Sequence, residues 1–391
     1  MKTATITWLK HNNFGTQLQA YALQQSILKL GVDNEIFYDD FALKTKSAVN
    51  ENVISNKHNL KYSIIYHIKR LIRAIMLIFS KKRRIQRKKN IELDKRIAKH
   101  ECSIESAFSE FKNKHLKIKY ISGYNELNNI CKNYDAFIAG SDQTWSPLVY
   151  NPYYYITFTD IKKISYAASI GITHIPEDLV SDIRSNIASY HNISVREESA
   201  KNALQPLYNK EISVVLDPTL LLRNDEWSKL AVLPDTKNYI LCYFLETNNW
   251  YYEYALKMSK NLNKKIILIP NRIEHLSYEF SNIKYPGPAE FVGLIKNADL
   301  IITDSYHGFI FSTIFEKSYV LIKRFEDNSP KNQNSRIFNL LNILNLQNVF
   351  ISEKEADLAD ICSPDYSSIK KIIDEKIQFS MNYLKGALGI I

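Results

Sequence analysis

Short apolar runs alternate with longer stretches of helical periodicity along most of the chain. Residues 3–9 read as a strand, residues 16–31 as a helix that Gly31 ends, and residues 34–40 as a second strand. The alternation starts again after residue 222, where four apolar runs are separated by helical stretches: 238–246, 264–270, 298–304 and 318–325. This pattern indicates parallel sheets with helices on both faces. We therefore predict an α/β protein with two doubly wound, Rossmann-like domains that face a cleft.

The chain of 391 residues is long enough for two domains that each bury a core. We predict an N-terminal α/β domain at 1–217 with a basic helical insertion at about 44–104, and a C-terminal α/β domain at 218–365. The linker is expected at 217–225, where a proline and polar residues interrupt the pattern. Residues 366–391 read as a final helix that crosses back onto the first domain.

The basic character of the chain is concentrated in residues 61–99. The net charge is +10, yet this segment alone holds fourteen Lys or Arg residues against two acids. On a helical wheel, residues 64–79 place a wide apolar face opposite a basic one, and a run of basic residues follows at 81–89. Two interpretations stay open: an interfacial helix on an anionic membrane surface, or a helix packed on the first domain with a solvated basic tail.

Other features narrow the classes of function. The four cysteines lie far apart without metal-ligand spacing, so we expect reduced thiols, no metal and no cofactor. No nucleic-acid motif accompanies the basic segment, so no nucleic-acid partner is expected. The chain shows no apolar signal core and no charge-free apolar stretch of about 18 residues. We predict a cytoplasmic protein, located at the inner face of the plasma membrane if the basic segment binds lipid.

The most informative segment is 298–308, ADLIITDSYHG. A buried strand is followed by polar residues and then by an apolar helix, which places His307 on the turn between them. Open α/β sheets bind ligands at such turns, where helix amides attract anions and an imidazole titrates near neutral pH. The competing interpretation is structural, with Ser305 as a helix cap and Gly308 as the residue that permits a tight turn.

Two further loops have the same character. Asn13 and Gly15 follow the first strand, and Gly15 is expected to let a ligand approach the backbone. Ser141, Asp142 and Gln143 follow the strand at 133–139, so three polar side chains converge at one strand end. Taken alone, each loop is equally consistent with a simple turn and helix cap.

Together with YAASIG (166–171), VREESA (195–200) and TDSYHG (303–308), these loops resemble the polysaccharide pyruvyl transferase family. The resemblance extends to about residue 350 and omits the basic segment. The family is similar in fold to the two-domain glycosyltransferases of the GT-B type. It implies transfer of pyruvate from phosphoenolpyruvate onto two hydroxyls of a sugar or polyprenyl-linked oligosaccharide. The product would be a cyclic ketal in a capsule or exopolysaccharide.

The resemblance also implies roles for individual residues. His307 matches the family histidine and is the expected general acid, while Arg196 matches an arginine that would clamp the carboxylate or phosphate. Better-known members carry an arginine two residues before the histidine, where this chain has Ser305. Arg324 or Arg336 would supply the missing cation, unless they are surface or salt-bridge residues. The expected donor site is Arg196, Ser305, Gly308, Arg324 and Arg336, and the expected acceptor side of the cleft is Asn13, Gly15, Ser141, Asp142 and Gln143.

Two rival functions remain at this stage. One is a GT-B glycosyltransferase that uses a nucleotide sugar. Against it, the paired glutamates eight residues apart of many retaining members are missing, since Glu316 is followed eight residues later by Arg324. The other is a non-catalytic member that only binds a sugar or a partner, which the missing arginine favours.

Overall fold

A computed structural model describes residues 1–39, 81–278, 280, 282–325, 334–346, 350–353 and 361–390. The apolar helix face expected at 64–79 lies outside these residues. So does the start of the predicted basic insertion, and of the basic run at 81–89 the structure gives the backbone course only. The two interpretations of that segment therefore rest on sequence.

The N-terminal half is built on a parallel sheet of five strands in the order β3-β2-β1-β4-β5. Isolated bridges from Ile164 to Asn192 and from Ala168 to Val195 continue this sheet into a further parallel pair, β6 and β7. The strands are β1 (Lys2–Ile6), β2 (Asp33–Asp39), β3 (Ile118–Ile121), β4 (Ala136–Ala139), β5 (Lys163–Ser165), β6 (Ile193–Val195) and β7 (Ile212–Val214).

The C-terminal half has a second parallel sheet in the order β12-β11-β10-β8-β9. Four of its strands are the four apolar runs of the sequence, and each carries an almost entirely buried stretch. The strands are β8 (Tyr239–Tyr243), β9 (Lys265–Ile269), β10 (Leu300–Thr303), β11 (Ser318–Ile322) and β12 (Phe350–Ile351).

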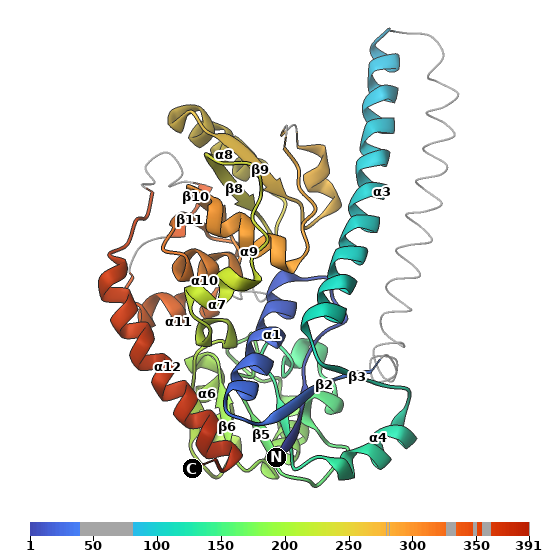
Figure 1. Cartoon of the computed structure of the whole chain (residues 1–391), viewed down its shortest axis with the longest axis vertical. Helices are drawn as coiled ribbons and strands as arrows, with labels where there is room; N and C mark the ends of the chain where they lie inside the picture. Colours follow the sequence, from blue (N-terminus) through green and yellow to red (C-terminus); the bar gives the residue numbers. More distant parts are fainter. Residues whose placement is uncertain are drawn as a thin grey trace.

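Helices cover both sheets (Figure 1). The α-helices are α1 (Phe14–Lys29), α3 (Lys81–His115), α4 (Tyr124–Ile130), α5 (Glu177–Ala188), α6 (Glu198–Leu204), α7 (Asn224–Leu230), α8 (Asn249–Leu262), α9 (Pro288–Asn297), α10 (Tyr306–Ile314), α11 (Ser335–Ile343) and α12 (Tyr366–Leu388). Short 3₁₀ helices are η2 (Cys131–Asn133), η3 (Pro147–Val149), η4 (Pro152–Tyr155), η5 (Gln205–Leu207), η6 (Pro218–Leu221) and η7 (Ile273–Ser277).

Both sheets are doubly wound, because the strand order reverses at one point in each. The first sheet reverses between β1 and β4, and the second between β8 and β10. A doubly wound sheet binds ligands beyond the carboxyl ends of the strands at this switch point. The fold class predicted from the sequence is confirmed, and it gives each half one such position.

An apolar seam joins the two halves. Phe14 at the start of α1 stacks on Phe291 of α9, with ring centroids 4.3 Å apart, and also contacts Phe108 and Tyr243. These residues belong to one buried cluster that contains side chains from both sheets. Stacked aromatic pairs add to the free energy of burial, so this contact fixes α1 against the second half.

Two connections cross between the halves. Residues 217–225, expected as a linker, form η6 and the start of α7, where Trp227 packs against Tyr21 of α1. The helix α12 starts beside β11 and ends on the first sheet (Figure 1), where the Tyr383 hydroxyl donates to the Ser165 carbonyl at 2.9 Å. The two halves are therefore held by a packed core and two crossings.

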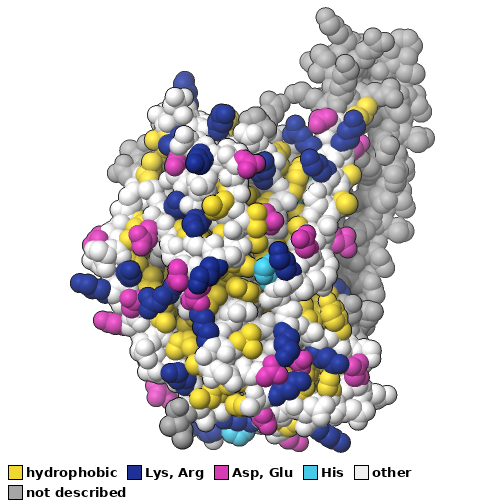
Figure 2. Space-filling model, in the orientation of Figure 1, with side chains coloured by type: hydrophobic (Ala, Val, Ile, Leu, Met, Phe, Trp, Pro, Cys, Tyr) yellow, Lys and Arg dark blue, Asp and Glu magenta, His cyan; other side chains and the backbone are white. Residues whose placement is uncertain are grey.

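The surface of the described part is mixed in charge. On the face shown in Figure 2, basic and acidic side chains are interspersed over both halves. Within the described residues, no helix has both the length and the apolar character needed to cross a bilayer.

A candidate active site between the two sheets

The switch points of the two sheets face one cavity of about 210 Å³. The loops after β1 and β4 form one wall, and the loops after β8, β10 and β11 form the other together with the start of α11. The lining residues are Trp8, His11, Asn13, Thr16, Asp142, Gln143, Leu245, Asp304, Ser305, Tyr306, His307, Arg324, Asn334, Arg336 and Ile337. Sequence segments more than 300 residues apart thus meet at one site.

The second wall is organised by the start of α10. The Thr303 hydroxyl donates to the Tyr243 carbonyl at 2.6 Å and accepts from the Ser305 amide at 3.0 Å, which fixes the end of β10. Ser305 is the N-cap of α10, and its hydroxyl accepts from the Gly308 amide at 3.2 Å. None of these three bonds uses the amides of Tyr306 and His307, which lie in the first turn of α10, at the positive end of the helix, where an anion is favoured.

This geometry corrects one expectation and explains a glycine. His307 lies in the first turn of α10 rather than on the turn before the helix. A Cβ atom on Gly308 would lie 2.6 Å from the Thr303 hydroxyl oxygen, too close for any side chain. Ser305 and Gly308 therefore shape the loop, as the structural interpretation expected, and Ser305 also lines the cavity.

The imidazole of His307 is held between the two halves. A Cβ atom on Gly15 would lie 2.0 Å from Nδ1 and 2.4 Å from Cε1 of His307, so the ring rests directly on the Gly15 backbone. We expected Gly15 to admit a ligand, but the space beside it is occupied by His307. On its other side, the His307 Nε2 atom lies 3.6 Å from the Asp217 Oδ2 atom.

Arg196, the expected donor clamp, is absent from the residues that line the cavity. It is 2% exposed, and its Nη1 atom donates to Asp217 Oδ2 at 2.7 Å. Its guanidinium lies 4.9 Å from the centre of the ring of Tyr306, a residue that lines the cavity. Burial disfavours a charged Asp217, yet His307, Arg196 and Thr219 hold the pKa of that carboxyl well below its usual range.

Arg324 and Arg336, the two alternatives for the missing cation, both line the cavity. Arg336 also lies 5.8 Å from the Tyr306 ring, on which Arg196 packs as well. Burial and the positive charges of Arg196 and Arg324 lower the pKa of Arg336 to about 10. An arginine in this position favours an anion nearby, because negative charge would relieve both desolvation and repulsion.

Asp304 ties the two switch-point loops of the second sheet together. Its carboxylate accepts from the Leu245 amide at 2.6 Å and the Glu246 amide at 3.0 Å. Burial raises the pKa of Asp304 to about 6, although Arg324 and the two amide bonds favour the ionised form. Asp304 therefore sets the position of the loop after β8 relative to His307.

The first wall is built around Asp142. Its φ of 75° is a left-handed conformation, which an aspartate tolerates better than most residues. Its carboxylate accepts from the Thr16 hydroxyl at 2.6 Å and from the Gln143 amide at 2.8 Å. Asn13 is the N-cap of α1, with its side chain accepting from the Thr16 amide at 3.1 Å. The turn thus directs the Asp142 carboxylate at the start of α1.

Three of the expected acceptor residues, Asn13, Asp142 and Gln143, line the cavity, whereas Ser141 is buried beside it. The Ser141 hydroxyl and the Gln143 Nε2 atom have no hydrogen-bond partner among the described residues. Buried polar groups without partners are uncommon in folded proteins. Of these two atoms, only Gln143 Nε2 belongs to a residue that lines the cavity, and it packs against the Gly171 backbone.

Several site residues escaped the sequence reasoning. Trp8 follows the first strand and lines the cavity, and Tyr306 forms the surface between Arg196 and Arg336. Asp217 follows β7 in the same way that Asp142 follows β4, but it was assigned to a linker. Glu197 is 1% exposed and accepts from the Ser169 hydroxyl at 2.6 Å. A polar residue at a strand end was the available signal for Trp8, Glu197 and Asp217.

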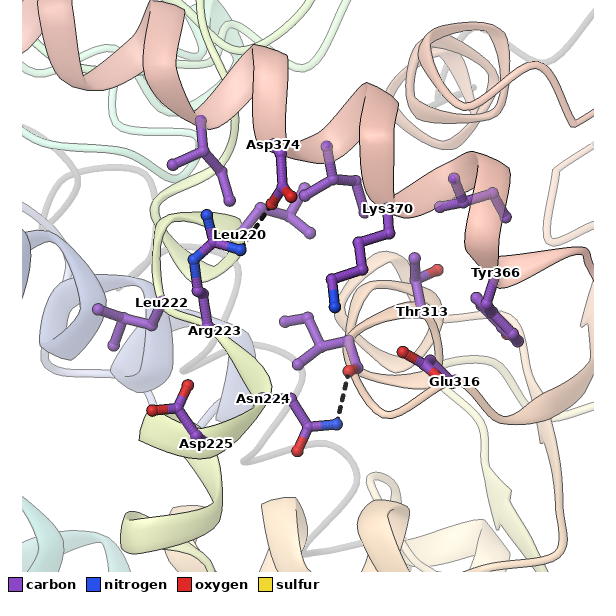
Figure 3. Close-up of a pocket in the computed structure, with 14 residues that line it drawn as sticks. Leu220, Leu222, Arg223, Asn224, Asp225, Thr313, Glu316, Tyr366, Lys370 and Asp374 are labelled. Atoms are coloured by element: carbon purple, nitrogen blue, oxygen red, sulfur yellow. Dashed lines mark hydrogen bonds and ion pairs between the residues drawn. The ribbon is translucent and has the colours of Figure 1, made fainter.

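A larger cavity of about 410 Å³ lies away from this chemistry, between α12, η6 and the start of α7 (Figure 3). Its walls combine aliphatic side chains with an ion pair in which Arg223 contacts Asp374 at 2.6 Å. Among the described residues no histidine lines it, and it lies at the carboxyl end of α10, whereas His307 is in the first turn. The smaller cavity is therefore the candidate active site: it offers anion-binding groups, a buried imidazole and a facing carboxylate.

Comparisons with solved structures give similarities over nearly the whole chain. The UDP-GlcNAc 2-epimerase of Neisseria meningitidis, bound to UDP-GlcNAc, is 12% identical, with 97% of this chain and 100% of that chain covered and a TM-score of 0.45. The enzyme of the same name from Methanocaldococcus jannaschii is 14% identical, with coverages of 96% and 99% and a TM-score of 0.44. An alpha-glucosyltransferase in complex with UDP and DNA is 9% identical, with coverages of 98% and 95% and a TM-score of 0.47. These values carry no information about the reaction of this chain.

The sequence comparisons are more specific. No curated protein matches the chain. The profile of the family described as polysaccharide pyruvyl transferase matches residues 13–323, which include the Asn13–Gly15 loop, Asp142, Asp217 and His307. The match begins at the first loop of the cavity and ends after β11. The chain belongs to the polysaccharide pyruvyl transferase family and is a transferase.

Proposed function

We propose that this chain transfers pyruvate from phosphoenolpyruvate onto two hydroxyls of a sugar, forming a cyclic ketal. The observation that carries the proposal is the positive charge that helix amino ends and two arginines bring to the cavity. The amino ends of three helices, α1, α10 and α11, supply lining residues next to Arg324 and Arg336. Helix amino ends and arginines both attract anions, and phosphoenolpyruvate presents a phosphate and a carboxylate on one three-carbon unit.

Arg324 and Arg336 bind the anionic groups of the donor in this proposal. Both reach the cavity, whereas the guanidinium of Arg196 is engaged with Asp217 behind Tyr306. A planar guanidinium can donate two parallel hydrogen bonds to a carboxylate or phosphate, which orients the donor as well as attracting it. The cation absent at Ser305 is thus replaced by arginines from the loop after β11 and from the start of α11.

His307 supplies the proton. The C3 methylene of phosphoenolpyruvate accepts the imidazolium proton, which generates an oxocarbenium-like centre at C2. One sugar hydroxyl attacks C2 and loses its proton, and the second hydroxyl then displaces phosphate and loses its own. One of these protons returns to His307 and the other leaves with inorganic phosphate, so atoms and charge balance. A positioned acid of this kind typically contributes about 10² to 10⁴ in rate.

The acceptor sugar lies against the first wall. Asn13 and Gln143 offer side-chain amides, and the Asp142 carboxylate faces the cavity from the side opposite His307. Asp142 is the group placed to take the proton of the attacking hydroxyl and pass it to the departing phosphate, because its bonds to Thr16 and Gln143 leave lone pairs unused. The acceptor is a surface-polysaccharide sugar, either free or on a polyprenyl-linked oligosaccharide.

The cellular setting follows from the sequence of the basic segment. We place the enzyme in the cytoplasm, with residues 61–99 on the anionic inner face of the plasma membrane, where a polyprenyl-linked acceptor would be found. The support is the apolar face at 64–79 beside a dense basic run.

A thermal-shift experiment tests the donor. Phosphoenolpyruvate at a hundred times its dissociation constant should stabilise the protein by about 2.7 kcal/mol, while UDP- and GDP-sugars should give no shift. His307→Ala should keep the shift and lose phosphate release with an aryl glycoside acceptor, because the imidazole donates a proton without anchoring the donor. Stabilisation by a nucleotide sugar alone would replace this proposal with a glycosyltransferase.

A further inference from the structure

The side chain of Asp217 is fixed at the meeting point of the two halves. It follows β7 and caps η6, where its Oδ1 atom accepts from the Thr219 amide at 2.9 Å and the Thr219 hydroxyl at 2.6 Å. These bonds turn the Oδ2 atom toward two groups, the Arg196 guanidinium at 2.7 Å and, at 3.6 Å, the His307 imidazole, which is cationic when protonated. Asp217 is 1% exposed, so water does not screen either interaction.

Asp217 lies at different distances from these two groups. Arg196 makes a short hydrogen bond, whereas 3.6 Å is too long for a hydrogen bond to His307. The His307 Nε2 atom has no hydrogen-bond partner among the described residues. The Asp217 carboxylate therefore attracts a His307 imidazolium by charge alone, while its short hydrogen bond goes to Arg196. Because Arg196 neutralises part of the negative charge on Asp217, it weakens the attraction between Asp217 and the imidazolium.

We propose that Asp217 is the positioning residue that orients the His307 imidazole and favours its imidazolium form, and that Arg196 limits how strongly Asp217 does so. This inference rests on the proposed function, in which His307 is the general acid. When His307 gives up its proton, Asp217 keeps a full partner in Arg196, so no isolated charge is left in the interior. The general acid and the two residues that control it thus come from three segments: Arg196 follows β6, Asp217 follows β7, and His307 lies at the start of α10.

Other charged groups around the pair stay constant in the test. Glu197 lies next to Arg196, with a carboxylate to guanidinium distance of 3.6 Å. Among the described residues, further charged groups line the same cavity: Asp142 after β4, Asp304 before α10, Arg324 after β11 and Arg336 on α11. The titratable side chains of His11 and Tyr306 line it too, and the Tyr306 ring contacts the His307 ring. At the start of α1, the Gly15 backbone contacts the imidazole, and Asn13 and Thr16 line the same cavity.

The imidazole pKa of His307 can be measured directly by NMR titration of the full chain labelled with ¹⁵N-histidine. His307→Ala identifies the signal. Asp217→Asn should lower this pKa by about one unit or more, because a facing negative charge is lost. Arg196→Gln should raise it, because the Asp217 carboxylate then loses its competing cation while its bonds from Thr219 remain. Asp217→Glu, which keeps the charge, should restore most of the parent value.

The double variant decides whether Arg196 acts through Asp217. In the Asp217→Asn background, Arg196→Gln should have little remaining effect, since the residue through which it acts is gone. An unchanged pKa in Asp217→Asn, or equal effects of Arg196→Gln in both backgrounds, would overturn the inference. If Asp217→Asn does not fold, the Arg196→Gln variant still decides, since an unchanged pKa there refutes the inference too.

The titration needs no substrate, so it separates this inference from the proposed function. If the pKa values move as expected while phosphoenolpyruvate fails to stabilise the protein, the coupling between Asp217 and His307 is supported and the donor assignment is refuted. If the donor binds but the pKa values do not move, the positioning role falls alone. With active protein, the high-pH limb of kcat/KM should shift to lower pH in Asp217→Asn, a change that a purely structural ion pair would not cause.

Discussion

Replacing Gly15 with alanine would test the contact on which the site depends. The added methyl group would lie 2.0 Å from the His307 Nδ1 atom, about 1.4 Å closer than an ordinary contact. The backbone of α1 is held by its cap and by the stacked Phe14 ring. The imidazole therefore has to move.

The size of the effect can be bounded from this overlap. A displacement of about 1 Å in a reacting group costs on the order of 10²-fold in rate, or about 2.7 kcal/mol of transition-state stabilisation. Overpacking a buried contact destabilises by about 1–3 kcal/mol. The better helix propensity of alanine returns at most about 1 kcal/mol. We expect a folded protein that is about 1–2 kcal/mol less stable and about a hundredfold less active.

The assay is phosphate release from phosphoenolpyruvate, with the most active member of a panel of aryl glycosides as acceptor, alongside urea unfolding. The matched control is Gly386→Ala, a glycine inside α12 with no atom within 4 Å of its added methyl group. Gly386→Ala should gain up to about 1 kcal/mol in stability and keep its activity.

A second control removes the clash instead of the methyl group. In a His307→Ala background, Gly15→Ala should no longer destabilise the protein, because the ring that it strikes is gone. If Gly15→Ala keeps activity within about threefold of the parent, against the hundredfold expected from displacement, the reasoning that His307 acts from this position fails.

Three further results are expected. Arg336→Lys should weaken phosphoenolpyruvate binding by about tenfold or more in calorimetry, since a point charge cannot replace a two-bond clamp, while Arg196→Lys should leave binding nearly unchanged. The raised pKa of Asp304, about 6 against 3.8, corresponds to about 3 kcal/mol of stability that is present below pH 4 and lost as pH rises through 6. Urea unfolding of Asp304→Asn should lack this decline, and a decline equal to that of the parent would contradict the assignment. Co-sedimentation with vesicles should require anionic lipid, weaken with salt, and fall when the four basic residues at 81–84 become glutamine; indifference to these changes would exclude a membrane role for the basic segment.

The fold was readable from sequence where apolar runs were long and bounded by polar residues. β8 to β11 and β4 met this condition, and so did their polar carboxyl ends. β3 and β12 were not anticipated, because β3 is mostly half-buried and β12 has only two residues. Such short edge strands are defined by their pairing with a neighbour, which no local pattern records.

Only part of the site could be predicted from the sequence, because local patterns do not record contacts between distant segments. Polar residues after strands 1, 4 and 10 were found because each follows a clear apolar run. The contact between Arg196 and Asp217 was not, because Asp217 is 21 residues away and approaches through the parallel pairing of β6 and β7. The role of Gly15 depends on a histidine from the other half of the chain. Distances between halves are set by packing rather than by sequence spacing.

The convergence of α1, α10 and α11 on one cavity has a consequence for the catalytic cycle. Each helix presents about half a positive charge at its amino end, and α1 belongs to a different half of the molecule from the other two. These ends repel each other, and the packed seam between the halves holds them close despite this repulsion. In the proposed reaction, the anionic groups of the donor would act as a counterion that offsets the repulsion. Release of inorganic phosphate would remove this counterion, so the complex with the modified sugar alone is expected to be less stable than the complex with the donor.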